Sequence, residues 1–170
     1  MREKLRKLVN LNTLEDIYLS GFVDIEDGVA EFYPNMRYLY FSLGDVYIEF
    51  QSVEQFSKMK IIITDSVRHE FEIDEDMIPS KASINEVILV DTLADNRIKE
   101  MLLYNISSIC DNDIICDAVQ INLISGQKIF LDPTFYYGIG IGGTLQKEWW
   151  ENNLSDDMPQ FEELVKFNVK

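Results

Sequence analysis

An alternation of apolar and polar residues between positions 117 and 132 constrains the fold of this chain more than any other feature. The alternating positions are Val119, Gln120, Ile121, Asn122 and Leu123. A period of two is typical of a strand with one face in the core and one face toward water. Ser125-Gly126 then provides a turn, and residues 128–131 provide a returning strand, which should end at Pro133 because proline donates no ladder hydrogen bond. The segment predicts an antiparallel β-hairpin.

Other stretches rich in β-branched and aromatic residues predict further strands. The predicted strands are residues 37–42, 46–53, 60–64, 71–73, 85–90 and 98–106, of which the last also fits a helix. The first two are joined at Leu43-Gly44-Asp45 in the manner of a hairpin. In the second, Ile48 and Phe50 alternate with Glu49, which predicts one buried face and one wet face, with Glu49 on the wet face.

Helices are predicted near the two ends of the chain. Residues 1–10 carry apolar positions among bases, which fits a short basic helix or a basic arm. A helix over residues 144–153, with Thr144 as its N-cap, would follow a glycine-rich loop, and a second short helix fits residues 160–167. The expected fold class is α+β, a mainly antiparallel β-sheet with a few peripheral helices. Because no linker or repeat divides the chain, residues 1–170 are expected to form a single domain.

The N-terminus and the two cysteines bear on the cellular compartment. The N-terminus lacks the apolar run of a signal peptide, and no window approaches the ~18 apolar residues of a membrane span. A cytoplasmic protein without membrane contact is therefore expected. In that compartment Cys110 and Cys116 are expected to be free thiols rather than a disulfide or a metal site.

Charge limits the partners of this chain. Thirty acidic residues against fifteen basic ones in 170 positions give a net charge of −15. A field this negative repels nucleic acid and anionic membranes, and it speeds encounter with cationic partners. Residues 11–57 hold nine acids and Arg37 as the one base, and residues 148–165 hold six acids and no base. A solvated surface explains any single cluster, but self-repulsion over the whole chain costs stability and points to a functional reason.

A glycine-rich stretch, Gly138-Ile-Gly-Ile-Gly-Gly143, satisfies the spacing G-x-G-x-x-G of dinucleotide sites. That function requires a βαβ unit and a later acid for the ribose, whereas the residues after Gly143 have a helical pattern. A loop that passes close to the sheet, or that adopts positive φ, is the expected role. No nucleotide or other cofactor is expected.

Patterns for catalysis and metal binding are missing. His69 is the single histidine and has only Glu70 and Glu72 nearby, so it is expected to be a surface residue. The acidic groups at positions 24–27 and 74–76 lack the alternation and the closing glutamate of an EF-hand. The sequence leaves open a Mg²⁺ site made only of carboxylates, but it predicts no catalytic residue, no metal ligand set and no enzyme activity.

Trp149 and Trp150 stand in the densest aromatic zone of the chain. Adjacent residues of a helix point about 100° apart, so the two indoles do not share one core face. One tryptophan is expected to anchor the helix on the sheet and the other to be partly exposed. Trp150 is the candidate contact with a partner, because tryptophan is favoured as an interface anchor.

The stretch from Gly126 to Gly143 reads Gly-Gln-Lys-Ile-Phe-Leu-Asp-Pro-Thr-Phe-Tyr-Tyr-Gly-Ile-Gly-Ile-Gly-Gly, and Gln-Lys-Glu-Trp-Trp follows at 146–150. This stretch resembles the C-terminal part of small bacterial immunity proteins from toxin–immunity systems. The resemblance covers about a sixth of the chain and transfers no binding residue. It implies an acidic, non-catalytic protein that caps a basic nuclease toxin.

These observations predict a non-catalytic acidic binding protein, and the first interpretation is a cytoplasmic immunity protein that neutralises a cationic, nuclease-like toxin domain. A structural or adaptor domain, including a self-associating one, is the alternative, and a nucleic-acid mimic is a third. Carboxylates would pair with the bases that a nuclease uses for phosphate, and aromatic side chains would anchor the contact. The candidate partner-binding residues are Asp24, Glu26, Asp27, Glu31, Glu49 and Trp150.

Overall fold

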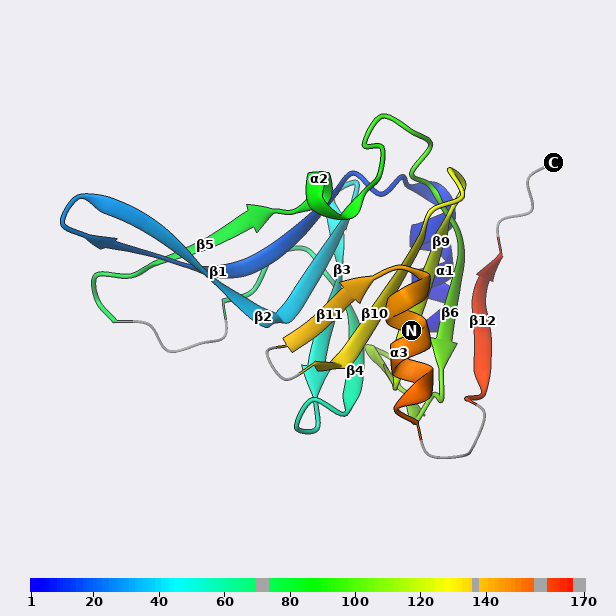
Figure 1. Ribbon diagram of the computed structural model, residues 1–170. Helices are drawn as coiled ribbons and strands as arrows, with labels where there is room; N and C mark the ends of the chain where they lie inside the picture. Colours follow the sequence, from blue (N-terminus) through cyan, green and yellow to red (C-terminus); the bar gives the residue numbers. More distant parts are fainter. Residues whose placement is uncertain (70–73, 136–137, 155–158, 167–170) are drawn as a thin grey trace.

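The computed structural model describes residues 1–69, 74–135, 138–154 and 159–166, which form two β-sheets and three helices (Figure 1). The larger sheet has the order β5-β1-β2-β3-β4-β8-β7 and the smaller one the order β11-β10-β9-β6-β12. The strands of the larger sheet are β1 (Asp16–Glu26), β2 (Val29–Leu43), β3 (Val46–Val53), β4 (Lys58–Thr64), β5 (Ile78–Ser83), β7 (Ser108–Ile109) and β8 (Asp113–Cys116). Those of the smaller sheet are β6 (Ile98–Tyr104), β9 (Ala118–Leu123), β10 (Lys128–Phe135), β11 (Gly138–Gly142) and β12 (Phe161–Lys166). All these strands pair antiparallel, which confirms the predicted α+β class.

The helices are α1 (Arg2–Leu11), α2 (Asn85–Ile88) and α3 (Thr144–Asn152). α1 buries Leu5 and Val9, four residues apart on one face, so the N-terminal segment is a helix rather than an extended arm. α3 packs on β10 and β11 and lies across one face of the smaller sheet (Figure 1). Its N-cap is Gly143, one residue before the predicted Thr144. No helix in the described ranges is long and apolar enough to cross a membrane.

One hydrophobic cluster joins the two sheets. It includes Leu39, Phe41, Ile48 and Phe50 from the larger sheet, and Met101, Val119, Ile121 and Leu131 from the smaller one. β9 therefore turns its apolar positions toward this core, as the alternation predicts. Gln120 lies on the other face of β9 but is only 8% exposed, so this face is more buried at Gln120 than the alternation predicts.

Four of these predicted strands are confirmed, and one segment adopts another structure. Residues 37–42, 46–53 and 60–64 lie in β2, β3 and β4, and residues 98–104 form a strand rather than a helix. The predicted strand at 85–90 is instead the single turn of α2, because the ladder of β5 ends at Ser83 and the chain then crosses to the smaller sheet. The predicted strand at 71–73 lies outside the described residues.

The predicted helix at 160–167 is wrong, because Phe161–Lys166 pairs with β6 as the edge strand β12. A register shift between Glu163 and Val165 breaks the two-residue period that would have marked a strand in the sequence. Pairing with an open sheet edge thus outweighs the local pattern.

Pro133 does not end its strand, and the glycine-rich loop is also a strand. β10 continues to Phe135. The ladder with β9 stops at Leu131, and the ladder with β11 is irregular between Asp132 and Phe135. Neither ladder therefore requires an N–H from Pro133. The stretch 138–142 forms β11. At Gly138 φ is +134°, and a Cβ would lie 2.2 Å from the carbonyl oxygen of Met36, so the expected close approach is confirmed there.

Candidate binding surface on the β1–β2 hairpin

The hairpin of β1 and β2 projects beyond the rest of the larger sheet (Figure 1). Its register slips between Leu19, which faces Leu39, and Gly21, which faces Pro34, so β2 contains extra residues at this point. Such an irregularity bends a strand. We call residues 21–34 the arm and the remainder of the two sheets the body.

The tip of the arm is a two-residue turn at Asp27 and Gly28, whose φ angles are 51° and 79°. Positive φ at both positions defines the mirror-image turn that suits the twist of a hairpin, and Asp-Gly is a preferred sequence for it. The predicted strands begin only at residue 37, although Asp27-Gly28 between aromatic and β-branched stretches is a signal that locates this hairpin.

One face of the arm carries the acids. Asp24 lies opposite Glu31 and Glu26 lies opposite Val29, and paired residues of antiparallel strands project to the same face. These residues and Asp27 line an open hollow of about 270 Å³. The structure therefore brings together four of the six candidate residues, namely Asp24, Glu26, Asp27 and Glu31.

Within the part of the chain that the structure describes, no base neutralises the carboxylates of this face. Among the described side chains, no lysine or arginine forms an ion pair with any of the four. Asp24 and Glu31 face each other as like charges, which destabilises a strand pair. The hydroxyl of Tyr33 donates a hydrogen bond of 2.9 Å to Oε2 of Glu31, and this bond with the nearby negative charge raises the pKa of Tyr33 above its ordinary value.

The opposite face of the arm is apolar. The register places Val23, Ile25, Ala30 and Phe32 on it, together with Ile78 of β5. Ile25 is 50% exposed and Ile78 is 51% exposed. The arm is thus a two-faced ribbon, acidic on one side and apolar on the other.

Glu49 lies in the body and is fully buried. The guanidinium of Arg68 donates from Nε to Oε2 at 2.8 Å and from Nη2 to Oε1, and the Arg68 N–H also donates to the Tyr40 hydroxyl at 3.3 Å. Burial and the charge of Glu49 raise the pKa of Tyr40. The prediction that Glu49 faces water is wrong, because the side chain and backbone of Arg68 cover this face of β3. This carboxylate is paired inside the fold and does not belong to the acidic surface.

Trp150 is also in the interior. Its ring packs 5.3 Å from Tyr104 and 5.5 Å from Phe130, measured between ring centroids, and anchors α3 on the smaller sheet. Trp149 is the exposed tryptophan of the pair, at 61%. In the acidic stretch around this helix, Glu151 already pairs with Lys147 at 2.9 Å, and Asp156 and Asp157 lie outside the described residues.

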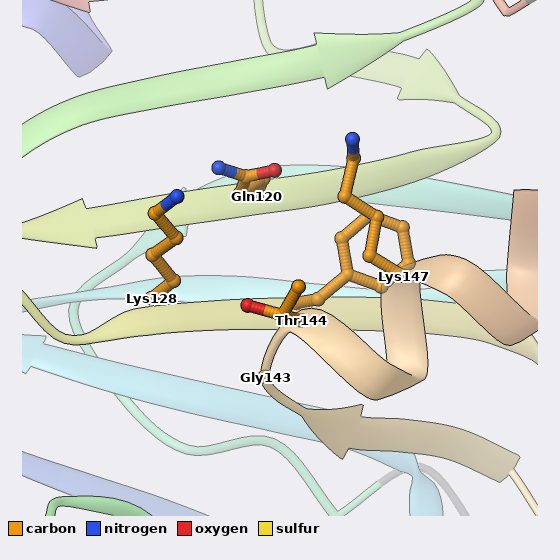
Figure 2. Close-up of a pocket in the computed structure, with 6 residues that line it drawn as sticks. Gln120, Lys128, Gly143, Thr144 and Lys147 are labelled. Atoms are coloured by element: carbon orange, nitrogen blue, oxygen red, sulfur yellow. The ribbon is translucent and has the colours of Figure 1, made fainter.

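A second hollow, of about 130 Å³, lies at the beginning of α3. Figure 2 shows Lys128 of β10 and Lys147 of α3 on either side of the Gln120 amide. Gln120 accepts a hydrogen bond from the Tyr104 hydroxyl at 3.1 Å and donates one to Asn122 at 2.8 Å. The residues that line this hollow include no histidine, cysteine or carboxylate. Both hydrogen bonds of Gln120 stay within the smaller sheet, and Lys147 lies over the Tyr104 ring, 5.6 Å from its centroid.

Groups suited to metal binding or thiol chemistry are dispersed. Within the described ranges, no three histidine, cysteine or acidic side chains converge closely enough to hold a metal ion. Cys110 and Cys116 are free thiols, the first exposed and the second buried, and burial raises the pKa of the Cys116 thiol to about 12. His69 is half-buried rather than fully at the surface.

Comparison of the chain with protein-family models, with curated proteins and with solved structures found no match. The net charge and the two-faced arm are therefore the observations from which a function can be inferred.

Proposed function

We propose that this protein is a non-catalytic acidic binding protein that captures a cationic protein partner, as an immunity protein does when it neutralises a nuclease-like toxin domain. The observation that carries the proposal is the acidic face of the arm. Its four carboxylates (Asp24, Glu26, Asp27 and Glu31) share one hollow on a projecting hairpin and have no ion-pair partner among the described residues.

The energetics of this face support a role in binding. Placing Asp24 opposite Glu31 opposes formation of the hairpin, and the acids make no compensating ion pair with the described part of the chain. Exposed ion pairs contribute only about 0–1 kcal/mol each, so the acids would mainly steer the encounter. Apolar contacts must then supply most of the affinity, and exposed Val29 and Tyr33 lie beside the acids.

The test begins with capture of the partner on the immobilised protein at low salt, followed by stopped-flow measurement of association with the purified partner. We expect the association rate to fall steeply with salt. The triple reversal Asp24→Lys, Glu26→Lys and Glu31→Lys should slow association several-fold at low salt, by up to about tenfold. The captured partner should be basic, and its own activity should be lost in the complex.

The matched control is the triple reversal Asp45→Lys, Glu86→Lys and Asp111→Lys, which changes the net charge equally at exposed positions outside the arm. It should slow association much less than the arm reversal. Equal slowing by both variants would mean that the net charge of the whole surface, and not the acidic face of the arm, steers association. A rate that ignores salt and both reversals would remove the physical basis of the proposal, and a partner that stays active in the complex would exclude neutralisation.

A further inference from the structure

The arm has an unpaired sheet edge. β2 pairs with β1 along the arm, whereas β3 pairs with β2 only from Tyr38 to Leu43. Among the described strands, none pairs with the other edge of β2 over residues 29–34. Such an edge presents backbone N–H and C=O groups that can accept another strand.

The acidic face and the apolar face of the arm make this edge selective for one kind of strand. A strand added here would place its side chains alternately beside the acidic face, next to Glu31, and beside the apolar face, next to Ala30 and Phe32. The complementary segment therefore alternates a basic residue with an apolar one. A second copy of this chain does not fit, because pairing the two β2 edges would set the acidic faces of both copies side by side, with Glu31 of each copy at the junction.

The other outer edge of this part of the sheet is protected differently. β5 pairs with β1 from Tyr18 to Val23, so it covers the base of the arm on this side, and it carries Pro79 and Lys81. Proline and lysine on an edge strand discourage the addition of any further strand. On the β2 side, Pro34 at the base and the turn at Gly28 limit the open edge to a short stretch.

We propose that the arm binds its partner by strand addition: an extended segment that alternates lysine or arginine with apolar residues pairs with the open edge of β2 at residues 29–33. The inference rests on the proposed function, since it specifies which element of the cationic partner is bound. Backbone hydrogen bonds would add to the affinity that the apolar contacts supply, and the two faces would provide specificity.

The probe is a fluorescent eight-residue peptide that alternates lysine and valine, and its binding is followed by fluorescence anisotropy. The control peptide has the same composition with its four lysines and four valines in two blocks. In two further versions of the alternating peptide every second amide is N-methylated. One version carries the methyl groups on the odd-numbered amides and the other on the even-numbered amides, so that each blocks the hydrogen bonds on one edge of the added strand. These two versions are the two N-methylated phases. Hydrogen exchange of the full chain, with and without peptide, locates the protected amides.

We expect the alternating peptide to bind at least about tenfold more tightly than the block peptide, since several backbone hydrogen bonds add to the same charge. One N-methylated phase should lose this advantage and the other should keep it, and protection should appear at residues 29–33. The double reversal Asp24→Lys and Glu31→Lys should weaken binding, whereas Asp45→Lys with Glu86→Lys should weaken it less.

Equal affinity for the alternating and block peptides would overturn strand addition, as would equal binding of both N-methylated phases or protection outside the arm. If the two peptides bind equally but remain sensitive to salt and to the arm reversal, the acidic binding function stands and only the strand-addition mode is wrong. Absence of binding by every peptide also overturns strand addition, and the stopped-flow experiment with the purified partner then decides the function separately.

Discussion

The body and the arm each contain a close pair of aromatic rings, in different surroundings. In the body the rings of Phe41 and Phe50 lie 5.1 Å apart and are fully buried. In the arm the rings of Phe22 and Tyr33 lie 5.2 Å apart, but Tyr33 is 41% exposed. The body pair meets edge to face, at 71° between the ring planes, and the arm pair is stacked, at 15°. We expect the body pair to stabilise the fold more, because only that pair removes its full apolar surface from water.

The two regions differ in the same way in their charges. Glu49 of the body is enclosed with Arg68, whereas Glu31 of the arm faces Asp24 and water. Removing the partner of a buried carboxylate destabilises the fold, because an uncompensated charge is left in the interior. An exposed carboxylate opposite a like charge destabilises the strand pair by repulsion. We expect the body to hold the fold together and the arm to tolerate substitutions at the carboxylates on which the proposed function depends.

The largest expected effect compares the two aromatic pairs. Phe50→Ala should lower the free energy of unfolding by about 3–5 kcal/mol, because it leaves a cavity in the core. Tyr33→Ala should lower it by less than about 1 kcal/mol, since much of the ring is already in water. Urea unfolding followed by circular dichroism measures both. A comparable loss in the two variants would mean that the arm is an integral part of the core.

The second comparison makes one substitution at two glutamates. Glu49→Gln should destabilise the protein by about 2–3 kcal/mol, because it removes the charge that pairs with Arg68. Glu31→Gln should stabilise it slightly, by about 0.2–1 kcal/mol, because it relieves the repulsion from Asp24. Unfolding titrations at low ionic strength give both values. A destabilising effect of Glu31→Gln would contradict the view that the acids oppose formation of the arm.

The third comparison uses the two cysteines and pH. The pKa of the Cys116 thiol is raised to about 12 in the folded protein, against about 8.5 when unfolded. As the pH rises, the unfolded chain therefore loses the thiol proton before the folded protein does. The contribution of the Cys116 thiol to stability is complete below pH 8.5 and falls as the pH rises from there toward 12. The slope is at most about 1.4 kcal/mol per pH unit, or about 2 kcal/mol by pH 10.

Unfolding at pH 8 and pH 10 of the wild type and of Cys116→Ala isolates this contribution from that of the tyrosines. The alanine variant should lose less stability between the two values. Cys110→Ala is the control and should behave as the wild type, because Cys110 is exposed. In the native state a thiol reagent should modify Cys110 and leave Cys116 unmodified. Rapid modification of Cys116 would show that the body opens more readily than its burial implies.

The sequence by itself determined the parts of this protein in which neighbours in the chain are also neighbours in space. The hairpin of β9 and β10, strand β3 and the part of β2 from residue 37 carry their periodicity locally. For residues 1–10 the sequence left a helix or an arm open, and the structure shows the helix α1. The acidity of residues 24–31 is also plain from the sequence.

Only the tertiary structure decided which of these charges reach a common surface. The register of the hairpin sets Asp24 opposite Glu31, and the distant Arg68 encloses Glu49. The same holds for β12, which becomes a strand because β6, some sixty residues earlier, offers an open edge. A local pattern records the preference of each residue for water or for a core. The residues that cover it come from elsewhere in the chain, and they decide whether a carboxylate lies on an exposed acidic face or in an interior ion pair.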